Sequence, residues 1–562
     1  MKRISRRHFI QAIGMSAVAG MAIASPLEAS ACSDADDSLT VWTNFGPVKG
    51  AFQENVKVWY GVPYGSAKRW QKPGYPMPWI QLRDCTHPGQ HALQCSKDWV
   101  SGATSISGTE DCLNLDIYAP LEADNLPVLV YIHGGNNQTG SSEEIPGQEI
   151  VYTNNCVYVC IDYRLGLFGF NCLPALQTQP RSTGNYAMLD IARALDWIRH
   201  NIARFGGDAN NITVAGASAG GRDIMAMLIS PLFAGKFEKA IVLSGGMTVA
   251  DESASSRQIA AAIAPLAVED GKAIDEDAAM EWLLTDADTV RDYLYSLEGS
   301  RLAALMADAS IRMSAFPHLY TDGVVLPKEG FDTDSYNSVP LIMLTGSTEF
   351  SLFCNYDSYY FTPEFESLPS ETQQATKTFV REYGSDMYRI FNAQCSAEKM
   401  YEKYHADIYL WQIDYGSRSS PTHIPEMGSF HGIFTPMMTT RHGYASMWDF
   451  TQSGYRAMGV LYNSYLEAFL ATGDPNCAGQ PEWDAWTPEQ HLSMVLDADE
   501  RTGIATAVMD DTSTTYDAII AQMEADSTVP LEIKQDVISR IMNGRWFSAA
   551  LDAHFNNPSL WK

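Results

Sequence analysis

Basic residues are scarce in this sequence. It contains 38 lysines and arginines against 67 aspartates and glutamates, and its formal net charge at pH 7 is −29. Binding to nucleic acid requires clustered Lys and Arg side chains that displace counterions from the phosphates. The composition therefore excludes a nucleic-acid-binding protein and indicates a solvated, repulsive surface.

Long uncharged apolar runs are also missing after the first 31 residues, so we expect no stable membrane insertion of the mature protein. No low-complexity linker, internal repeat or block of like charge divides the chain. With 46% hydrophobic residues over 562 positions, the composition is that of a globular protein with a large core. We therefore expect a single domain from residue 32 to residue 562.

The first 31 residues have the features of an export signal. A basic start is followed by a weakly apolar stretch, and Ala29 and Ala31 supply the small residues that a signal peptidase needs. The segment Ser5–Ile10 reads SRRHFI and resembles the twin-arginine signal of bacterial export. We predict a signal peptide at residues 1–31 and an exported protein that is periplasmic, bound to the cell surface or secreted.

Metal-binding cysteine patterns are absent from the sequence. None of the ten cysteines belongs to a CxxC pair or a Cys/His cluster, which are the patterns of structural zinc sites. We therefore expect no bound metal. In an exported chain, these cysteines are compatible with at least one disulfide.

Short apolar runs alternate with longer amphipathic segments from Leu126 onward. Continuous hydrophobicity is typical of strands in a sheet that is covered on both faces, and the segment Asn185–Phe205 has apolar residues at helical spacing. The pattern predicts an α/β fold with a mostly parallel central sheet, helices on both faces, and large cap insertions around residues 250–338 and 350–406. The expected strands are Leu126–His133, Val157–Tyr163, Ile212–Ala215, Ala240–Ser244, Pro340–Thr345, Ile408–Ile413 and Met494–Leu496.

A serine flanked by glycines lies between one of these strands and a helix. The residues Gly216–Gly220 read GASAG, after the strand Ile212–Ala215 and before an apolar pattern with helical spacing. A serine in such a turn is forced into a strained backbone conformation, and only glycines leave room for the strand and the helix to pass so closely. The strain presents the hydroxyl at the carboxyl end of the sheet. Ser218 is therefore the candidate nucleophile.

A second glycine-rich turn, Ile132–Asn137, ends the strand that begins at Leu126. Its backbone N–H groups, together with that of Ala219, can point at the charge that develops on a carbonyl oxygen. We therefore expect an oxyanion hole at this turn. A serine hydroxyl also needs a base to take its proton and an acid to orient that base, so two further residues must complete the site.

Further segments of the sequence match the motifs of one enzyme family, namely Tyr60–Tyr64, Glu110–Asp116, Tyr163–Gly166, Gly184–Asn185, Phe205–Asp208, the turn around Ser218, and Ser244–Gly245. With these motifs, the sequence resembles the type-B carboxylesterases, which include cholinesterases and bacterial para-nitrobenzyl esterases, across nearly all of the mature chain. The resemblance implies an α/β-hydrolase fold and a serine-histidine-glutamate triad. It also implies that neither a metal nor an organic cofactor takes part.

By position, the resemblance implies the oxyanion donors and the acid. The donors fall on Gly135, Asn136 and Ala219, and Asn136 replaces a small residue there. The acid of the family follows a strand in a turn that begins with glycine. After the expected strand Pro340–Thr345, this position is Glu349.

The base of the family lies in a G-x-x-H-G context, which matches Gly428–Gly432 and assigns His431. His423, eight residues earlier, is the alternative base, and it lacks that glycine context. The order serine, acid, histidine fits the hydrolase fold. The resemblance also implies an early disulfide between Cys95 and Cys112.

The predicted activity is hydrolysis of a small-molecule carboxylic ester through an acyl-enzyme on Ser218. Two alternatives stay open at this point. One is a non-catalytic binding protein on a carboxylesterase scaffold, since a fold does not guarantee a function. The other is hydrolysis of lactones or amides by the same triad. Labelling of Ser218 by an organophosphate distinguishes the first alternative, and a kinetic panel of leaving groups distinguishes the second.

Overall fold

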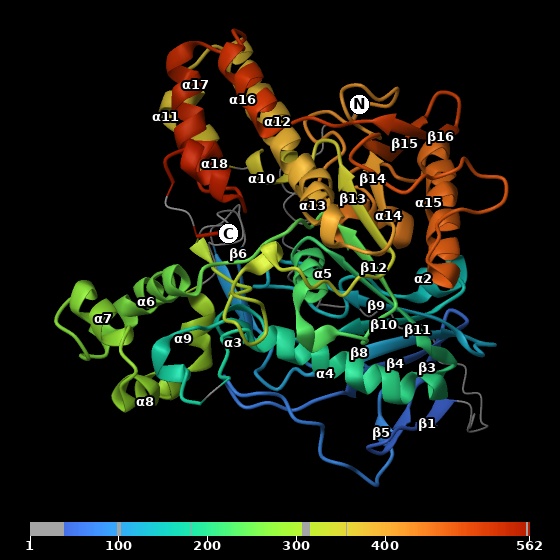
Figure 1. Cartoon of the computed structure of the whole chain (residues 1–562), viewed down its shortest axis with the longest axis vertical. Coiled ribbons are helices and arrows are strands. Elements are labelled where there is room, and N and C mark those ends of the chain that lie inside the picture. The colour runs from blue at the N-terminus through green and yellow to red at the C-terminus, as the bar shows by residue number, and fades with distance from the viewer. Residues whose placement is uncertain are drawn as a thin grey trace.

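A computed structural model gives the arrangement of residues 39–97, 103–179, 181–305, 315–355, 357–557 and 560–561. The predicted signal peptide, residues 1–31, lies outside these described residues. An 11-stranded mixed sheet runs through their centre (Figure 1). The other described strands form two small sheets, and these contain β1 (Thr40–Trp42), β2 (Pro47–Lys49), β5 (Arg83–Asp84), β6 (Gln94–Lys97) and β7 (Thr104–Ser107).

The central sheet is parallel in its middle and antiparallel at both edges. Its strand order is β16-β15-β14-β13-β12-β11-β9-β10-β8-β4-β3, and the strands from β15 to β10 pair in parallel. The predicted, mostly parallel sheet is therefore confirmed, and each expected strand is present. The strands are β3 (Ala51–Gln53), β4 (Val56–Pro63), β8 (Asn114–Pro120), β9 (Leu126–Ile132), β10 (Val157–Ile161), β11 (Gly207–Ala217), β12 (Lys239–Leu243), β13 (Leu341–Gly346), β14 (Ile408–Ile413), β15 (Leu492–Asp499) and β16 (Ile504–Asp511).

Helices cover both faces of the sheet, as predicted. One face carries α4 (Tyr186–Asn201) and α5 (Ala219–Ile229), and the other carries α2 (Gln148–Thr153) and α15 (Ser453–Thr472). Successive residues of a strand point to opposite faces. In β9, Val128 packs in the same apolar cluster as α4 and α5, whereas Leu129 packs in the cluster of α2 and α15. Burial on both sides explains why the strands read as continuous apolar runs.

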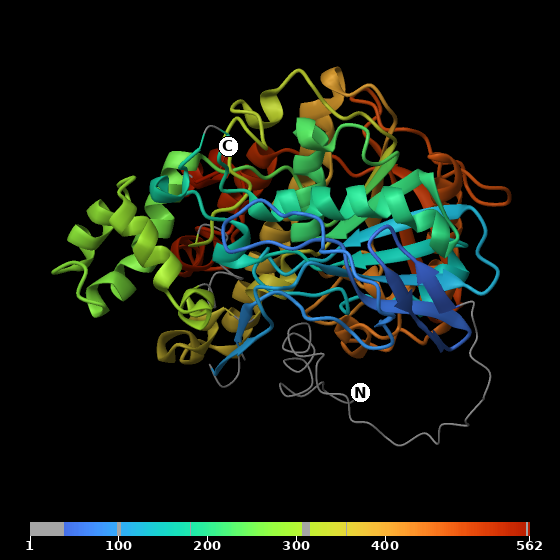
Figure 2. The ribbon, with the colours of Figure 1, turned by 90° about the horizontal axis from the view of Figure 1, so that it is seen from below.

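Two insertions carry further helices in the regions expected for the cap. The first follows β12 and forms a lobe that projects beside the sheet (Figure 2). It contains α6 (Glu252–Glu269), α7 (Glu276–Leu283), α8 (Asp288–Ser296) and α9 (Gly299–Ala304). The second follows β13 and contains α10 (Ser351–Cys354), α11 (Pro363–Glu366), α12 (Ser370–Asn392) and α13 (Gln394–Met400). Across the described residues, no helix is both long enough and apolar enough to cross a membrane.

The C-terminal helices extend the second insertion, which the sequence had not led us to expect. α16 (Tyr516–Ala525) and α17 (Leu531–Val537) pack against α12, and α18 (Ala549–His554) joins the same apolar cluster. A buried ion pair between Arg545 and Asp357 ties the C-terminal segment to the second insertion. The cap therefore combines residues that lie far apart in the sequence.

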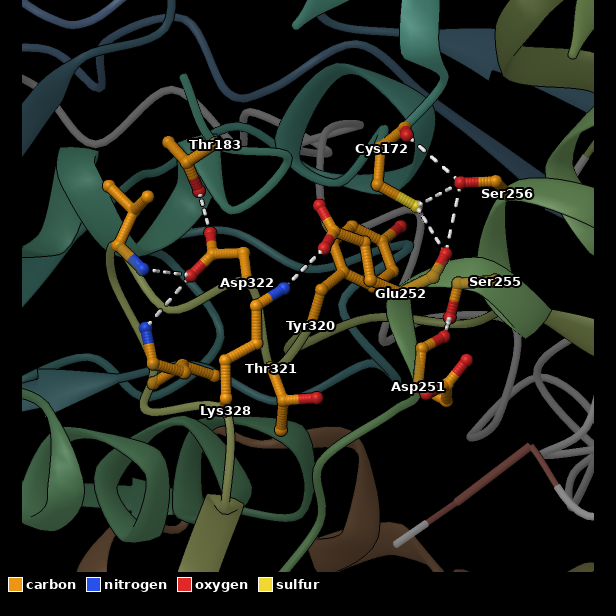
Figure 3. Close-up of polar contacts among 12 residues, drawn as sticks. Cys172, Thr183, Asp251, Glu252, Ser255, Ser256, Tyr320, Thr321, Asp322 and Lys328 are labelled. Atoms are coloured by element: carbon orange, nitrogen blue, oxygen red, sulfur yellow. Dashed lines mark hydrogen bonds and ion pairs between the residues drawn. The ribbon is translucent and has the colours of Figure 1, made fainter. Parts of the chain in front are cut away.

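The segment 315–332 returns from the first insertion and is anchored by Asp322 (Figure 3). Oδ1 of Asp322 accepts hydrogen bonds from the N–H groups of residues 324–326 at 2.8, 2.9 and 3.1 Å. Its other oxygen accepts from the hydroxyl of Thr183 and from Nδ2 of Asn185, the latter at 3.0 Å. Asn185 in turn accepts from the N–H of Tyr320 at 2.8 Å. One carboxylate thus holds the segment against the start of α4.

The expected disulfide between Cys95 and Cys112 is not formed, and no disulfide joins two cysteines anywhere in the described chain. Cys95 is a buried residue of β6. Cys112 is fully buried, and burial raises the pKa of its thiol well above the usual range. The structure does not show this bridge, which stays a prediction. In the same described regions, no group of three or more His, Cys, Asp or Glu side chains is placed to hold a metal ion.

Candidate active site

The turn between β11 and α5 has the strained geometry expected of an exposed nucleophile. Ser218 has φ +54° and ψ −117°, a conformation that residues other than glycine rarely adopt. A Cβ atom at Gly220 would lie 2.0 Å from the carbonyl oxygen of Ile132, so no larger residue fits there. The predicted succession of strand, sharp turn and helix is therefore confirmed around Ser218.

Neighbouring strands hold Ser218 in place. Its backbone N–H donates to the carbonyl oxygen of Leu243 at 2.8 Å, and its own carbonyl oxygen accepts from the N–H of Arg222 at 3.0 Å. A Cβ atom at Gly134 would lie 3.3 Å from the Cβ of Ser218. The glycine-rich turn after β9 therefore borders the half-buried serine directly.

Three consecutive residues in the left-handed region shape this glycine-rich turn. Gly135, Asn136 and Asn137 have φ values of +91°, +55° and +57°. The side-chain amide of Asn137 donates to Asp223 of α5 at 2.8 Å, which ties the turn to the helix. Ala219 is the first residue of α5, so its N–H has no acceptor inside the helix. The structure thus places the predicted donors Gly135, Asn136 and Ala219 on two turns that meet at the nucleophile.

Glu349 and His431, predicted as acid and base, form a hydrogen-bonded pair. Nδ1 of His431 donates to Oε2 of Glu349 at 2.5 Å. Oε1 of Glu349 accepts from the hydroxyl of Ser244 at 2.5 Å and from the N–H of Gly346 at 2.6 Å. The side chain of Glu349 is fully buried, and that of His431 is 7% exposed. When Nδ1 of a neutral histidine carries the proton, Nε2 keeps its lone pair and can act as a base.

The loops that carry the acid and the base follow two adjacent strands. β13 and β14 pair in parallel, so their carboxyl ends lie together. The N–H of Thr348 donates to the carbonyl oxygen of Ser429 at 3.0 Å, which joins the two loops. The alternative base, His423, is exposed and its Nδ1 lies 3.2 Å from the carbonyl oxygen of Ser417. Of these two histidines, only His431 contacts Glu349.

The end of β12 connects the nucleophile to the pair formed by Glu349 and His431. Leu243 accepts the hydrogen bond from the backbone of Ser218, and the next residue, Ser244, donates to Glu349. β12 lies between β11 and β13 in the sheet. The three residues of the expected triad therefore follow strands whose carboxyl ends share one edge of the sheet.

Aromatic side chains of the second insertion surround the base. The ring of His431 lies 4.9 Å from that of Phe353, and the ring of Tyr388 meets it edge-on at 6.2 Å. Phe350, next to the acid in sequence, instead packs in the core, 5.2 Å from the ring of Trp546. Some of these aromatics therefore line the site, and others are ordinary core.

Three residues near the site were not identified from the sequence: Ser244, Arg222 and Tyr388. Ser244 belongs to a family motif, but its contact with Glu349 depends on the tertiary fold. Arg222 has a detectable signal, because it is a charged residue in the first turns of an apolar helix and such a position indicates a buried charge. Tyr388 lies in the long helix α12 and has no local signal.

Comparisons with a family model, with curated proteins and with solved structures all match this chain to esterases. A model of the carboxylesterase family matches residues 37–364. A para-nitrobenzyl esterase of Bacillus subtilis (strain 168) is 27% identical over 490 residues, which cover 82% of this chain and 95% of that protein. Carboxylesterase 1E of Rattus norvegicus is 33% identical over 324 residues, covering 53% of this chain and 56% of that protein. A solved PNB esterase structure superposes with a TM-score of 0.67 at 25% identity and covers 86% of this chain and 99% of its own.

Proposed function

This chain belongs to the carboxylesterase family and is an ester hydrolase, and we propose that it acts on small-molecule esters through an acyl-enzyme on Ser218. The observation that carries the proposal is the Glu349–His431 hydrogen bond at the same edge of the sheet as the strained serine. In support of these roles, Ser218 lies in a strained turn, Nδ1 of His431 contacts the acid, and Glu349 is fully buried.

In the first step, His431 takes the proton of the Ser218 hydroxyl while the oxygen attacks the ester carbonyl. Glu349 supports this step because its contact with Nδ1 orients the imidazole and stabilises the cation that forms. The N–H groups of Gly135, Asn136 and Ala219 stabilise the tetrahedral oxyanion. One such donor is worth about 3 kcal/mol in the transition state.

His431 then gives its proton to the leaving alcohol, and the acyl group stays on Ser218. In the second step, the same imidazole removes a proton from water, which attacks the acyl-enzyme. Collapse of the second tetrahedral intermediate releases the acid and returns the proton to Ser218. The buried surroundings of Glu349 and His431 strengthen each of these polar interactions.

Replacement of the nucleophile tests the proposal. Ser218→Ala is expected to lower kcat for a neutral phenyl ester by about 10⁴-fold or more, since the covalent step is lost. Wild-type protein incubated with an organophosphate should gain the mass of one phosphoryl adduct on the peptide that contains Ser218. Ser464→Ala, at a half-buried position of α15 where the hydroxyl donates to the carbonyl oxygen of Val460, is the matched control and should keep full activity.

Two results would contradict the proposal. One is full ester hydrolysis by Ser218→Ala, which would assign the activity to another group. The other is the absence of hydrolysis and of labelling in the wild-type protein, which would indicate a binding protein on this scaffold. A leaving-group panel with matched amides and lactones then tests whether esters are the preferred substrates.

A further inference from the structure

Three arginines are buried in the described chain, and one of them differs from the others. Arg164 pairs with Asp190 at 2.7 Å, and Arg545 pairs with Asp357. Arg222, which is 1% exposed, makes no ion pair with any carboxylate of the described residues. A buried charge without a partner costs several kcal/mol. The fold therefore maintains an unbalanced positive charge one helical turn after the nucleophile.

The contacts of Arg222 satisfy only part of its guanidinium group. Nη2 donates to the side-chain oxygen of Asn136 at 2.9 Å, and the guanidinium carbon lies 4.3 Å from the centre of the Phe547 ring. Nε is buried without an acceptor. The adjacent Asp223 bonds to Asn137 instead, and burial raises the pKa of Asp223 to about 7. At neutral pH, Asp223 is therefore only partly ionised and balances part of the charge of Arg222.

Three further polar atoms near Arg222 are buried without a hydrogen-bond partner, namely Oδ2 of Asp223, the hydroxyl of Tyr388 and Nε2 of His318. The Phe547 ring that covers Arg222 lies 6.2 Å from the ring of His318. Burial, with a smaller contribution from the charge of Arg222, lowers the pKa of His318 to about 3. His318 is therefore neutral, and Arg222 supplies the positive charge of this group of residues.

The same group of residues reaches the base. Tyr388 meets the ring of His431 edge-on at 6.2 Å, and Phe391 lies 6.0 Å from Tyr388 and 5.7 Å from Phe547. Arg222 follows Ser218 by one turn of α5, with its N–H bonded to the Ser218 carbonyl oxygen. At 1.5 Å per residue, the backbones of the two residues lie about 6 Å apart along the helix axis. The nucleophile and Arg222 therefore project from neighbouring turns of one helix.

We propose that Arg222, with the hydroxyl of Tyr388, binds a carboxylate at the far end of the substrate's acyl chain, so that the preferred esters are half-esters of short dicarboxylic acids. The inference rests on the proposed acyl-enzyme function of Ser218. An arginine and a phenol both donate hydrogen bonds, and a carboxylate accepts several at once. A bound carboxylate would also supply the acceptor that the buried Nε of Arg222 lacks.

Positioning of Asn136 is the competing role for Arg222. The bond from Nη2 also holds the side chain of a residue whose N–H is a proposed oxyanion donor. Loss of that bond would slow the hydrolysis of every ester to a similar degree. Loss of a carboxylate site would slow only the esters that carry the carboxylate. Substrate selectivity therefore separates the two roles.

The test compares matched phenyl esters on purified full-length protein. Phenyl hydrogen glutarate and phenyl pentanoate have acyl chains of similar length and differ in the terminal carboxylate. Wild type should show the higher kcat/KM for the glutarate. Arg222→Met should lose about tenfold to a hundredfold on the glutarate and less than about threefold on the pentanoate, as expected for a charge-assisted hydrogen bond. Tyr388→Phe should also lower kcat/KM for the glutarate more than for the pentanoate, by a smaller factor than Arg222→Met does.

Control variants make the comparison independent of folding and of net charge. Arg257→Met removes one exposed cation on α6 and should leave both rates unchanged. Arg222→Lys keeps the charge without the planar fork and should show an intermediate loss on the glutarate. Organophosphate labelling of Ser218 in each variant reports an intact nucleophile.

Three outcomes overturn the proposal. Equal losses on both esters in Arg222→Met would assign Arg222 to the positioning of Asn136. A wild-type preference for the pentanoate would exclude a carboxylate site. A preference for 4-carboxyphenyl pentanoate over phenyl hydrogen glutarate would place the anion on the alcohol side. If wild type hydrolyses none of these esters and Ser218 is not labelled, the acyl-enzyme function itself fails, which is a distinct result.

Discussion

At the scale of single residues, Ser244 sets the orientation of Glu349. Its hydroxyl donates to Oε1 at 2.5 Å, while the other carboxylate oxygen binds His431. A hydrogen bond to a charged group contributes about 1.5–3 kcal/mol. Ser244→Ala is therefore expected to lower kcat by about tenfold or more with little change in KM, because the carboxylate gains freedom to turn away from the imidazole. Steady-state kinetics on a neutral ester measures both constants.

Ser244→Gly separates this role from backbone strain. Ser244 has φ +53°, a conformation that glycine adopts readily and alanine does not. Both variants remove the hydroxyl, so both should lose the same activity. Ser244→Gly should unfold at a higher urea concentration than Ser244→Ala. Wild-type kcat in either variant would contradict a positioning role for this residue.

At the scale of elements, Asp322 determines the position of the segment 315–332, which carries His318. The carboxylate accepts from three backbone N–H groups of this segment and from two side chains at the start of α4. Asp322→Ala leaves several buried donors without an acceptor. We expect it to lower the free energy of unfolding by about 2–4 kcal/mol, measured by urea denaturation.

Asp334→Ala is the matched control for this element. Asp334 lies on the same stretch of chain, is 92% exposed, and pairs only with Lys403 on the surface. Surface ion pairs contribute little to stability, so the urea midpoint of Asp334→Ala should equal that of wild type. Equal midpoints for Asp322→Ala and Asp334→Ala would show that the segment is held by its apolar contacts instead.

The elements that could be predicted are those whose own sequence decides their structure. β9 and β12 are buried on both faces, and their sequences are continuous apolar runs. The glycines around Ser218 indicate a tight turn between a strand and a helix, because a larger residue would clash there. The packing of α16 and α17 on α12 depends on residues more than a hundred positions apart, and no local pattern reports it. The pairing of Cys95 with Cys112 is equally beyond a local pattern, since bonding of two thiols depends on their distance in space.

The same distinction applies to the candidate site. Glycine motifs mark Ser218, Glu349 and His431 because each lies in a tight turn that only certain residues permit. Arg222 and Tyr388 lie on the regular helices α5 and α12, where the backbone conformation does not require one particular type of residue. Their relation to the base comes from how α5 and α12 pack, which the sequence pattern does not specify.

At the scale of the whole molecule, buried carboxylates link stability to pH. Ser142 bridges two of them, since its hydroxyl donates to Asp116 at 2.8 Å and its N–H donates to Asp162 at 3.0 Å. Burial raises the pKa of Asp116 to about 7, and burial together with the charge of Asp116 raises the pKa of Asp162 well above the usual range. The folded chain therefore keeps protons that the unfolded chain releases near pH 4.

Because the folded-state pKa of Asp116 is raised, the stability that its protonation contributes is complete below about pH 4 and is lost as the pH rises through about 7. One such proton corresponds to about 1.4 kcal/mol per pH unit. Asp116→Asn keeps the shape and an acceptor for the N–H of Gly61, but it cannot ionise. Between pH 4.5 and 7, the free energy of unfolding should fall less steeply with pH in Asp116→Asn than in wild type. The two slopes should differ by about 1.4 kcal/mol per pH unit. Urea denaturation at stepped pH measures this difference, with Asp292→Asn, at an exposed position of α8, as the control. Parallel pH profiles for wild type and Asp116→Asn would show that Asp116 is already ionised throughout this range.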